Sequence, residues 1–177
     1  MKKFLVIIGI IITFFIIYFL QANFFTWFTI AGIMPNLFII FIIFIGLFIG
    51  KKAGLILGLI FGIYIDIVIG KSIGTSGIML GIIGLIAEYI DKSFSKDSRI
   101  TIMSITAVCT AIYEIGMYMF QIIKWGTIIE IIPFLKILLV EIFFNAILVI
   151  ILYPIIQKLG QKIETIFKGN TVLTRYF

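Results

Sequence analysis

Six long apolar runs, separated by short breaks, constrain the fold of this chain more than any other feature. Only 12% of its residues are charged, about half of the share in a soluble domain, so there is too little polar surface to cover a globule in water. We therefore expect an all-α integral membrane protein that forms a single transmembrane domain over residues 1–177, with a short cytoplasmic tail over residues 157–177. The six expected transmembrane helices are Phe4–Leu20, Leu37–Ile49, Ala53–Ile69, Ile73–Ile90, Ile100–Ile123 and Phe134–Ile156.

The positions of the basic residues predict the orientation. If Lys2 and Lys3 are cytoplasmic, six crossings place eleven of the 14 basic residues on the cytoplasmic side. This bias predicts that both termini are cytoplasmic. The basic residues gather at the ends of apolar runs, a pattern that favours contact with anionic lipid headgroups over binding of nucleic acid.

The second run and the stretch before it depart from a simple row of spans. Leu37–Ile49 amounts to about 20 Å of helix, which is short for a hydrocarbon core of ~30 Å. The preceding residues, Asn23 to Asn36, are uncharged and rich in aromatic side chains, and Pro35 prevents a helix from continuing through them. We expect this stretch to dip into the outer leaflet as an irregular or re-entrant piece.

Glycine recurs at four-residue intervals through the third run and beyond it. The glycines are Gly54, Gly58, Gly62, Gly70 and Gly74, and Asp66 takes the missing place in the series. Glycines spaced four apart lie on one face of a helix and let another backbone approach closely. Two interpretations stay open: a surface that holds a partner helix, or close packing within the chain's own bundle.

Three acidic residues fall inside the apolar runs and are expected in the outer half of the membrane. At ~1.5 Å per residue, Asp66 and Glu114 lie about 20 Å from the cytoplasmic ends of their runs, and Glu141 lies about 10 Å inward from the outer end. With Asn145 one turn deeper than Glu141, they can form one acidic cluster. A charge in a membrane helix must face protein or water. The cluster therefore receives a cation, a proton, or a basic side chain of a partner, or its acids pair with Lys71, Lys124 or Lys136.

Residue types for catalysis or metal binding are scarce. The chain has no histidine and one cysteine, Cys109, so we expect no metal site and no cofactor. The sequence Gly-Thr-Ser-Gly at 74–77 has the form found in rhomboid proteases, but Ser76 has no histidine to activate it. We expect Ser76 to cap the fourth helix instead. With no Walker A sequence either, nothing favours an enzyme.

The stretch from Pro35 to Ile90 resembles the core of MreD, the rod shape-determining membrane protein of bacteria. That pattern has a Pro-Asn/Asp-Leu start, a basic hinge, and a glycine-rich helix ending in Asp. A second glycine-rich helix follows. The matching residues here are Pro35, Asn36, Leu37, Lys51, Gly54, Gly58, Gly62, Asp66, Gly70 and Gly74.

The resemblance implies a non-enzymatic scaffold in the bacterial cytoplasmic membrane. MreD-like proteins associate with MreC, which has one transmembrane helix, and with the RodA glycosyltransferase and its transpeptidase partner. Through them the complex links cytoplasmic MreB filaments to peptidoglycan synthesis.

The MreD family is similar in fold to the S components of energy-coupling-factor vitamin transporters, which are small six-helix proteins. A substrate-binding S component is therefore the alternative function. Such proteins dock their transport partner through an alanine motif on the first helix, and Phe4–Leu20 contains no alanine. A transporter that couples to protons or cations through the acidic residues is a third interpretation.

Overall fold

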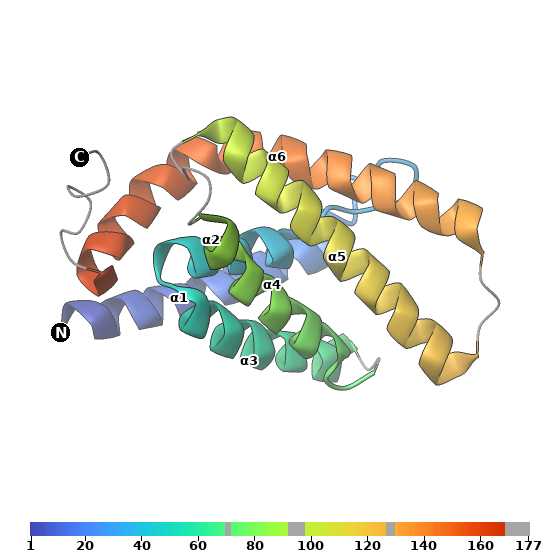
Figure 1. Ribbon diagram of the computed structural model, residues 1–177, viewed down its shortest axis with the longest axis horizontal. Helices are drawn as coiled ribbons and strands as arrows, with labels where there is room; N and C mark the ends of the chain where they lie inside the picture. Colours follow the sequence, from blue (N-terminus) through green and yellow to red (C-terminus); the bar gives the residue numbers. More distant parts are fainter. Residues whose placement is uncertain (70–71, 92–97, 127–129, 169–177) are drawn as a thin grey trace.

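The computed structural model describes residues 1–69, 72–91, 98–126 and 130–168. The described part is helical except for short turns and an isolated bridge between Ile30 and Ile33 (Figure 1). A π-helical turn, η1 (Leu20–Phe24), continues the first helix. The helices are α1 (Lys2–Phe19), α2 (Leu37–Phe48), α3 (Lys51–Ile69), α4 (Thr75–Asp91), α5 (Arg99–Trp125) and α6 (Ile131–Lys168).

Four of these segments are long and apolar enough to cross a membrane. They are α1 together with η1, α3, α5 and α6. Helix α2 and the apolar part of α4 are shorter. The structure therefore contains the six expected helices, of which two have less than the usual length of a membrane span.

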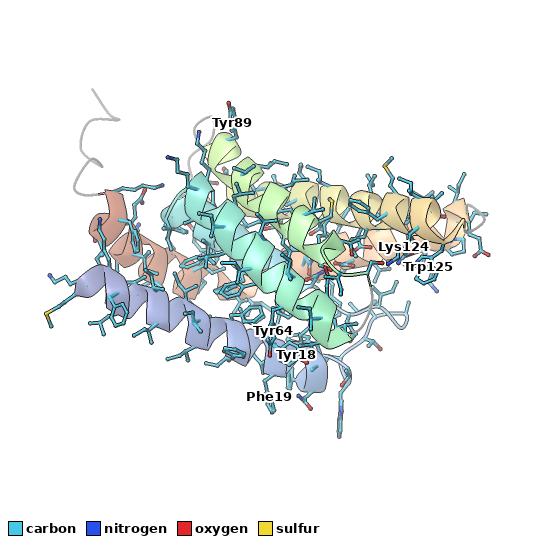
Figure 2. The ribbon with its side chains drawn as sticks, turned by 90° about the horizontal axis from the view of Figure 1, so that it is seen from below. Tyr18, Phe19, Tyr64, Tyr89, Lys124 and Trp125 are labelled. Atoms are coloured by element: carbon cyan, nitrogen blue, oxygen red, sulfur yellow. The ribbon has the colours of Figure 1, made fainter. Side chains whose placement is uncertain are left out.

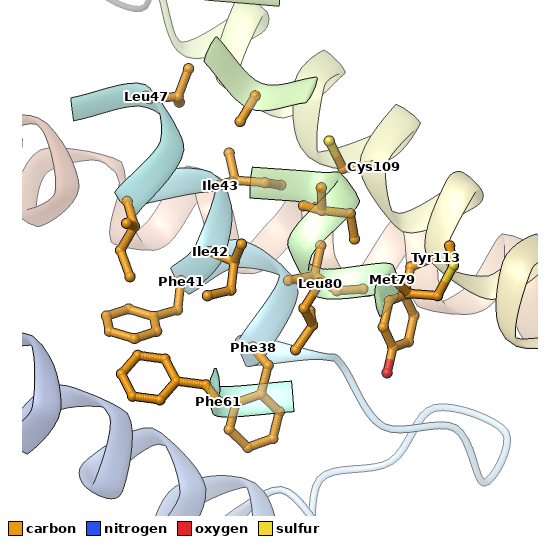
Figure 3. Packing of buried hydrophobic residues seen from close by; sticks show 14 of the residues in the cluster. Phe38, Phe41, Ile42, Ile43, Leu47, Phe61, Met79, Leu80, Cys109 and Tyr113 are labelled. Carbon is orange, nitrogen blue, oxygen red and sulfur yellow. The ribbon is translucent and has the colours of Figure 1, made fainter. Parts of the chain in front are cut away.

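Helix α2 lies at the centre of the bundle, and the other five helices surround it (Figure 1). Eleven of its 12 residues are buried. A helix that is apolar on every side has no face to offer to water, so it is stable only when neighbours or lipid surround it. Figure 3 shows Phe38, Phe41 and Ile42 of α2 packed against Phe61 of α3 and Leu80 of α4.

Helices α3 and α4 pack antiparallel, backbone against backbone, along their glycines. A Cβ atom added to Gly54 would lie 2.7 Å from the carbonyl oxygen of Gly84, and one added to Gly58 would lie 2.5 Å from that of Leu80. At the other end of the pair, Gly62 faces the backbone of Gly77. The space beside the regularly spaced glycines of α3 is thus occupied by α4 of the same chain.

Helix α1 is the most peripheral helix and is attached through aromatic side chains. Phe14 is 1% exposed, and its ring stacks on that of Phe61 of α3 at a centroid distance of 4.1 Å. Tyr18 and Tyr64 extend this contact, with centroids 6.1 Å apart (Figure 2). Much of the remaining surface of α1 is apolar and exposed, as expected for a helix that faces lipid.

Helix α6 is longer than the sequence led us to expect. The prediction that this helix ends at Ile156 and that residues 157–177 form a tail is wrong for residues 157–168, which continue the helix. Pro154 lies inside the helix, and the helix changes direction in its last third (Figure 1). A proline in a helix removes one backbone hydrogen bond, which permits such a bend without ending the helix.

The stretch between α1 and α2 consists of η1, turns and the bridge between Ile30 and Ile33. Gln21 holds the end of this stretch in place, next to α2. The side-chain amide of Gln21 donates to the carbonyl oxygen of Pro35 at 2.6 Å, and its Oε1 accepts from the N–H of Leu37 at 3.2 Å. The start of α2 is therefore fixed by a polar side chain from η1.

Candidate functional site

Asp66 lies in the last turn of α3 and is only 2% exposed. Its Oδ2 accepts hydrogen bonds from the backbone N–H groups of Gly74, at 2.8 Å, and Ser76, at 3.0 Å. The first N–H groups of a helix have no partner within the helix. A carboxylate at that end also interacts favourably with the helix dipole. Asp66 therefore caps α4 from the neighbouring helix.

The expectation that Ser76 caps α4 is wrong. Helix α4 begins at Thr75, so Ser76 lies inside its first turn and its N–H receives the cap from Asp66. The buried side chain of Ser76 instead lies close to the hydroxyl group of Tyr113 on α5.

Asn145 of α6 joins three helices and is completely buried. Its Oδ1 accepts a hydrogen bond from the N–H of Asn36, at the start of α2, at 2.8 Å. Its Nδ2 donates to Oγ1 of Thr110 on α5 at 3.0 Å. The amide thus provides an acceptor for α2 and a donor for α5, which leaves both of its ends satisfied.

Glu141 lies one turn before Asn145 on α6 and is 6% exposed. Its carboxyl group interacts with the side chains of Glu114, Asn36 and Asn145. Within the described residues, Oε1 of Glu141 and Oδ1 of Asn36 are buried acceptors without a hydrogen-bond donor. A buried acceptor that lacks a donor loses its hydration without compensation, at a cost of about 1–3 kcal/mol.

Tyr113 connects the surroundings of Asp66 with those of Glu141. It lies close to Ser76 and interacts electrostatically with Glu114, Glu141 and Asp66. Its ring packs beside Met79 at the edge of the apolar core (Figure 3). We call the following residues the buried polar cluster: Asn36, Asp66, Ser76, Thr110, Tyr113, Glu114, Glu141 and Asn145.

The cluster includes all four residues that the sequence placed in an acidic group: Asp66, Glu114, Glu141 and Asn145. The sequence also suggested that these acids pair with Lys71, Lys124 or Lys136, and for two of these three lysines the pairing is not seen. In the part of the chain that the structure describes, neither Lys124 nor Lys136 forms an ion pair with Asp66 or Glu141, and both lysines are exposed. Lys71 lies outside the described residues.

The predicted glycine row does not form a free surface. Gly54, Gly58 and Gly62 are buried against α4. Gly74 has a positive φ of 95° in the turn before α4, a conformation that glycine adopts without strain. Gly70 lies outside the described residues. Pro35 and Asn36, also predicted as site residues, are held at the start of α2 by Gln21 and Asn145.

Sequence reasoning missed Thr110, Tyr113 and Gln21. A signal for Thr110 was present, because Thr106, Thr110 and Glu114 follow one another at four-residue intervals on one face of α5. Thr106 and Thr110 are both completely buried. A polar stripe on a membrane helix that is otherwise apolar points toward protein and not toward lipid.

The cluster is rich in acceptors and is suited to bind a hydrogen-bond donor or a positive charge. Carboxyl and amide oxygens are contributed by α2, α3, α5 and α6, and the pair Glu141 and Asn36 has acceptor capacity to spare. Within the described residues there is no group of three or more histidine, cysteine or acidic side chains that could hold a metal ion.

The sequence was compared with protein-family models, with curated proteins and with solved structures. The model described as rod shape-determining protein MreD matches residues 1–163. No curated protein and no solved structure matches the chain. The matched region contains every residue of the buried polar cluster and the whole helical bundle except the last five residues of α6. The resemblance predicted from Pro35 to Ile90 is confirmed, and the chain belongs to the MreD family of rod shape-determining membrane proteins.

Proposed function

We propose that this protein is a non-enzymatic scaffold of the cell-elongation complex, which binds MreC and links it to peptidoglycan synthesis. RodA and its transpeptidase partner are the proposed synthetic partners, and MreB is linked indirectly. The observation that supports this function is the family match over residues 1–163. The same match favours the scaffold over the S component of a vitamin transporter, for which no comparable support exists.

Depletion of the protein in its native cell tests this function. We expect a rod-shaped cell to become round as the protein is lost, and to recover when the gene is expressed again. Normal shape combined with a new vitamin requirement would contradict the scaffold and favour the S component.

The arrangement of the helices fits six crossings of the bacterial cytoplasmic membrane, with both termini on the cytoplasmic side. Lys168, at the end of α6, donates to the carbonyl oxygen of Leu47 near the end of α2. The ammonium group of Lys3, at the start of α1, lies 5.7 Å from the ring centre of Phe167. The start of α1 and the ends of α2 and α6 therefore share one end of the bundle, as alternating crossings require.

The buried polar cluster is the proposed site for a basic side chain of a partner. It lies toward the opposite end of the bundle, because Asn36 starts α2 and Asp66 is in the last turn of α3. The unsatisfied oxygens of Glu141 and Asn36 would accept from a Lys or Arg of an incoming chain. A proton held by Glu141 is the competing solution, since a protonated carboxyl can donate to an amide oxygen.

The substitution Glu141→Gln separates these two solutions. Glutamine has the shape of a protonated glutamate but carries no charge, so a site for a basic side chain should lose most of its affinity. We expect Glu141→Gln to insert normally and to co-purify with less MreC than the wild type. Undiminished association would show that the charge of Glu141 is not used in binding. Glu130→Gln serves as the matched control, because Glu130 is an exposed acid outside the buried polar cluster.

A further inference from the structure

The last part of α6, Ile155–Lys168, has an apolar and a basic face. The apolar side chains recur every three or four residues, and the remaining positions are polar. This is the spacing of an amphipathic helix. Its polar residues include three lysines and a single acid, Glu164, which pairs with Lys168 at 3.5 Å. The apolar series is Ile155, Ile156, Leu159, Gly160, Ile163, Ile166 and Phe167.

The length of α6 places this segment outside the hydrocarbon core. From Ile131 to Pro154 the helix measures about 36 Å, which already exceeds a core of ~30 Å. The bend in the last third of α6 then turns the segment away from the direction of the crossing part (Figure 1). Its residues therefore lie at the depth of the lipid headgroups.

Contacts with α1 and α2 fix which side of the segment remains free. Gly160 is buried against the ring of Phe48, where an added Cβ would come within 2.5 Å. Lys168 donates to the carbonyl oxygen of Leu47 at 2.9 Å, so its charge is used within the protein. The edge of the apolar series away from Phe48 is exposed, and there Ile155 and Leu159, 56% and 50% exposed, lie beside the exposed Lys158 and Lys162.

We propose that Ile155–Lys168 is an interfacial helix that binds anionic phospholipid headgroups of the inner leaflet through Lys158 and Lys162. Ile155 and Leu159 insert between the acyl chains on the same side. Apolar side chains next to lysines that form no ion pair with a described residue fit a lipid interface, which offers hydrocarbon and negative charge within a few ångströms. Exposed aliphatic side chains alone would also suit a protein partner, and it is the adjacent lysines that favour an anionic lipid surface. The inference uses the orientation proposed above but does not depend on MreC.

A tryptophan reporter in proteoliposomes tests this inference. Trp27 and Trp125 are replaced by Phe, and Leu159→Trp then provides the only indole in the full-length chain. The vesicles contain phosphatidylcholine and phosphatidylglycerol, with bromine on the acyl chains of one lipid or the other. We expect about twofold stronger quenching when phosphatidylglycerol carries the bromine. High salt, or the double substitution Lys158→Gln and Lys162→Gln, should remove the difference.

Two further tryptophan variants serve as a control and as a second reporter. Ile60→Trp, on the exposed side of α3, should be quenched equally by both lipids, because the residues within one turn of it on α3 are uncharged. Ile155→Trp repeats the measurement if Leu159→Trp alters the elution of the purified protein. Equal quenching of the Leu159→Trp reporter would overturn the selectivity for anionic lipid. Quenching by aqueous acrylamide without quenching by lipid would overturn the interfacial position and favour a cytoplasmic protein as partner. Cysteine labelling of the termini checks the orientation separately.

Discussion

The carboxylate of Asp66 belongs to one helix and caps another. It belongs to α3, yet among the described residues its donors are the N–H groups of Gly74, just before α4, and of Ser76, in the first turn of α4. A capping residue normally precedes its own helix by one position, and Asn performs this task about as well as Asp. The buried aspartate, which in a membrane protein suggests a transport or binding role, thus also has a structural role through its Oδ2.

Removing the capping oxygen of Asp66 should destabilise the protein more than removing only its charge. We expect Asp66→Ala to lower the free energy of unfolding by about 1–3 kcal/mol, because two backbone N–H groups lose their acceptor. Asp66→Asn keeps a carbonyl oxygen in place and should lose less than about 1 kcal/mol. The difference is measured by heating each variant in detergent and following the loss of folded protein by size-exclusion chromatography. Equal losses in the two variants would argue against the capping role and for a role of the charge.

At the scale of elements, the pair α3 and α4 determines how tightly the bundle closes. Lipid surrounds membrane helices with hydrocarbon as apolar as their own side chains, so close van der Waals contact replaces the hydrophobic effect as the driving force. The facing glycines Gly54 and Gly84, and Gly62 and Gly77, bring the two backbones into such contact. A partner helix could reach these glycines only by displacing α4.

A methyl group in this interface should separate the two helices. We expect Gly58→Ala to destabilise the protein by about 1–3 kcal/mol, because the new Cβ would meet the backbone of Leu80 at 2.5 Å. Gly9→Ala on α1 is the matched control, since among the described residues no atom apart from its chain neighbours and its own helix backbone lies within 4 Å of its added Cβ. Alanine has the higher helix propensity, so Gly9→Ala should be neutral or stabilising. Similar melting temperatures for both variants would contradict the close packing.

For the molecule as a whole, the sequence predicted the helices better than their contacts. The apolar runs predicted the number and order of the helices, because each run must satisfy its backbone internally in lipid. They did not predict that α6 continues to Lys168, because its amphipathic end is no longer a continuous apolar run. The donors to Asp66 are backbone N–H groups, which have no residue-specific signature. The joining of Asn36, Thr110 and Asn145 depends on the register of three helices, which no single run encodes.

Cysteine labelling distinguishes six crossings from four. With six, Lys52→Cys at the start of α3 faces the cytoplasm, and Ile73→Cys before α4 faces outward. If the short helices α2 and α4 failed to cross, both positions would change sides. We expect a membrane-impermeant maleimide to label Ile73→Cys in intact spheroplasts and Lys52→Cys only after permeabilisation. The native Cys109 is buried and should give little background.

The central position of α2 has a consequence for how the protein is made. Its 12 residues, about 18 Å long, emerge from the ribosome before α3, α4, α5 and α6, which provide most of its surroundings. A segment this short is held weakly by the bilayer alone, so with the proposed six crossings α2 would enter the membrane as a hairpin with α3, whose basic start would remain in the cytoplasm. Its contact with α6, in which Asn145 accepts from the N–H of Asn36 at the start of α2, can form only after α6 has been synthesised. The surroundings of α2 are therefore completed only once α6 is present, and a chain truncated before α6 would leave the central helix without this partner.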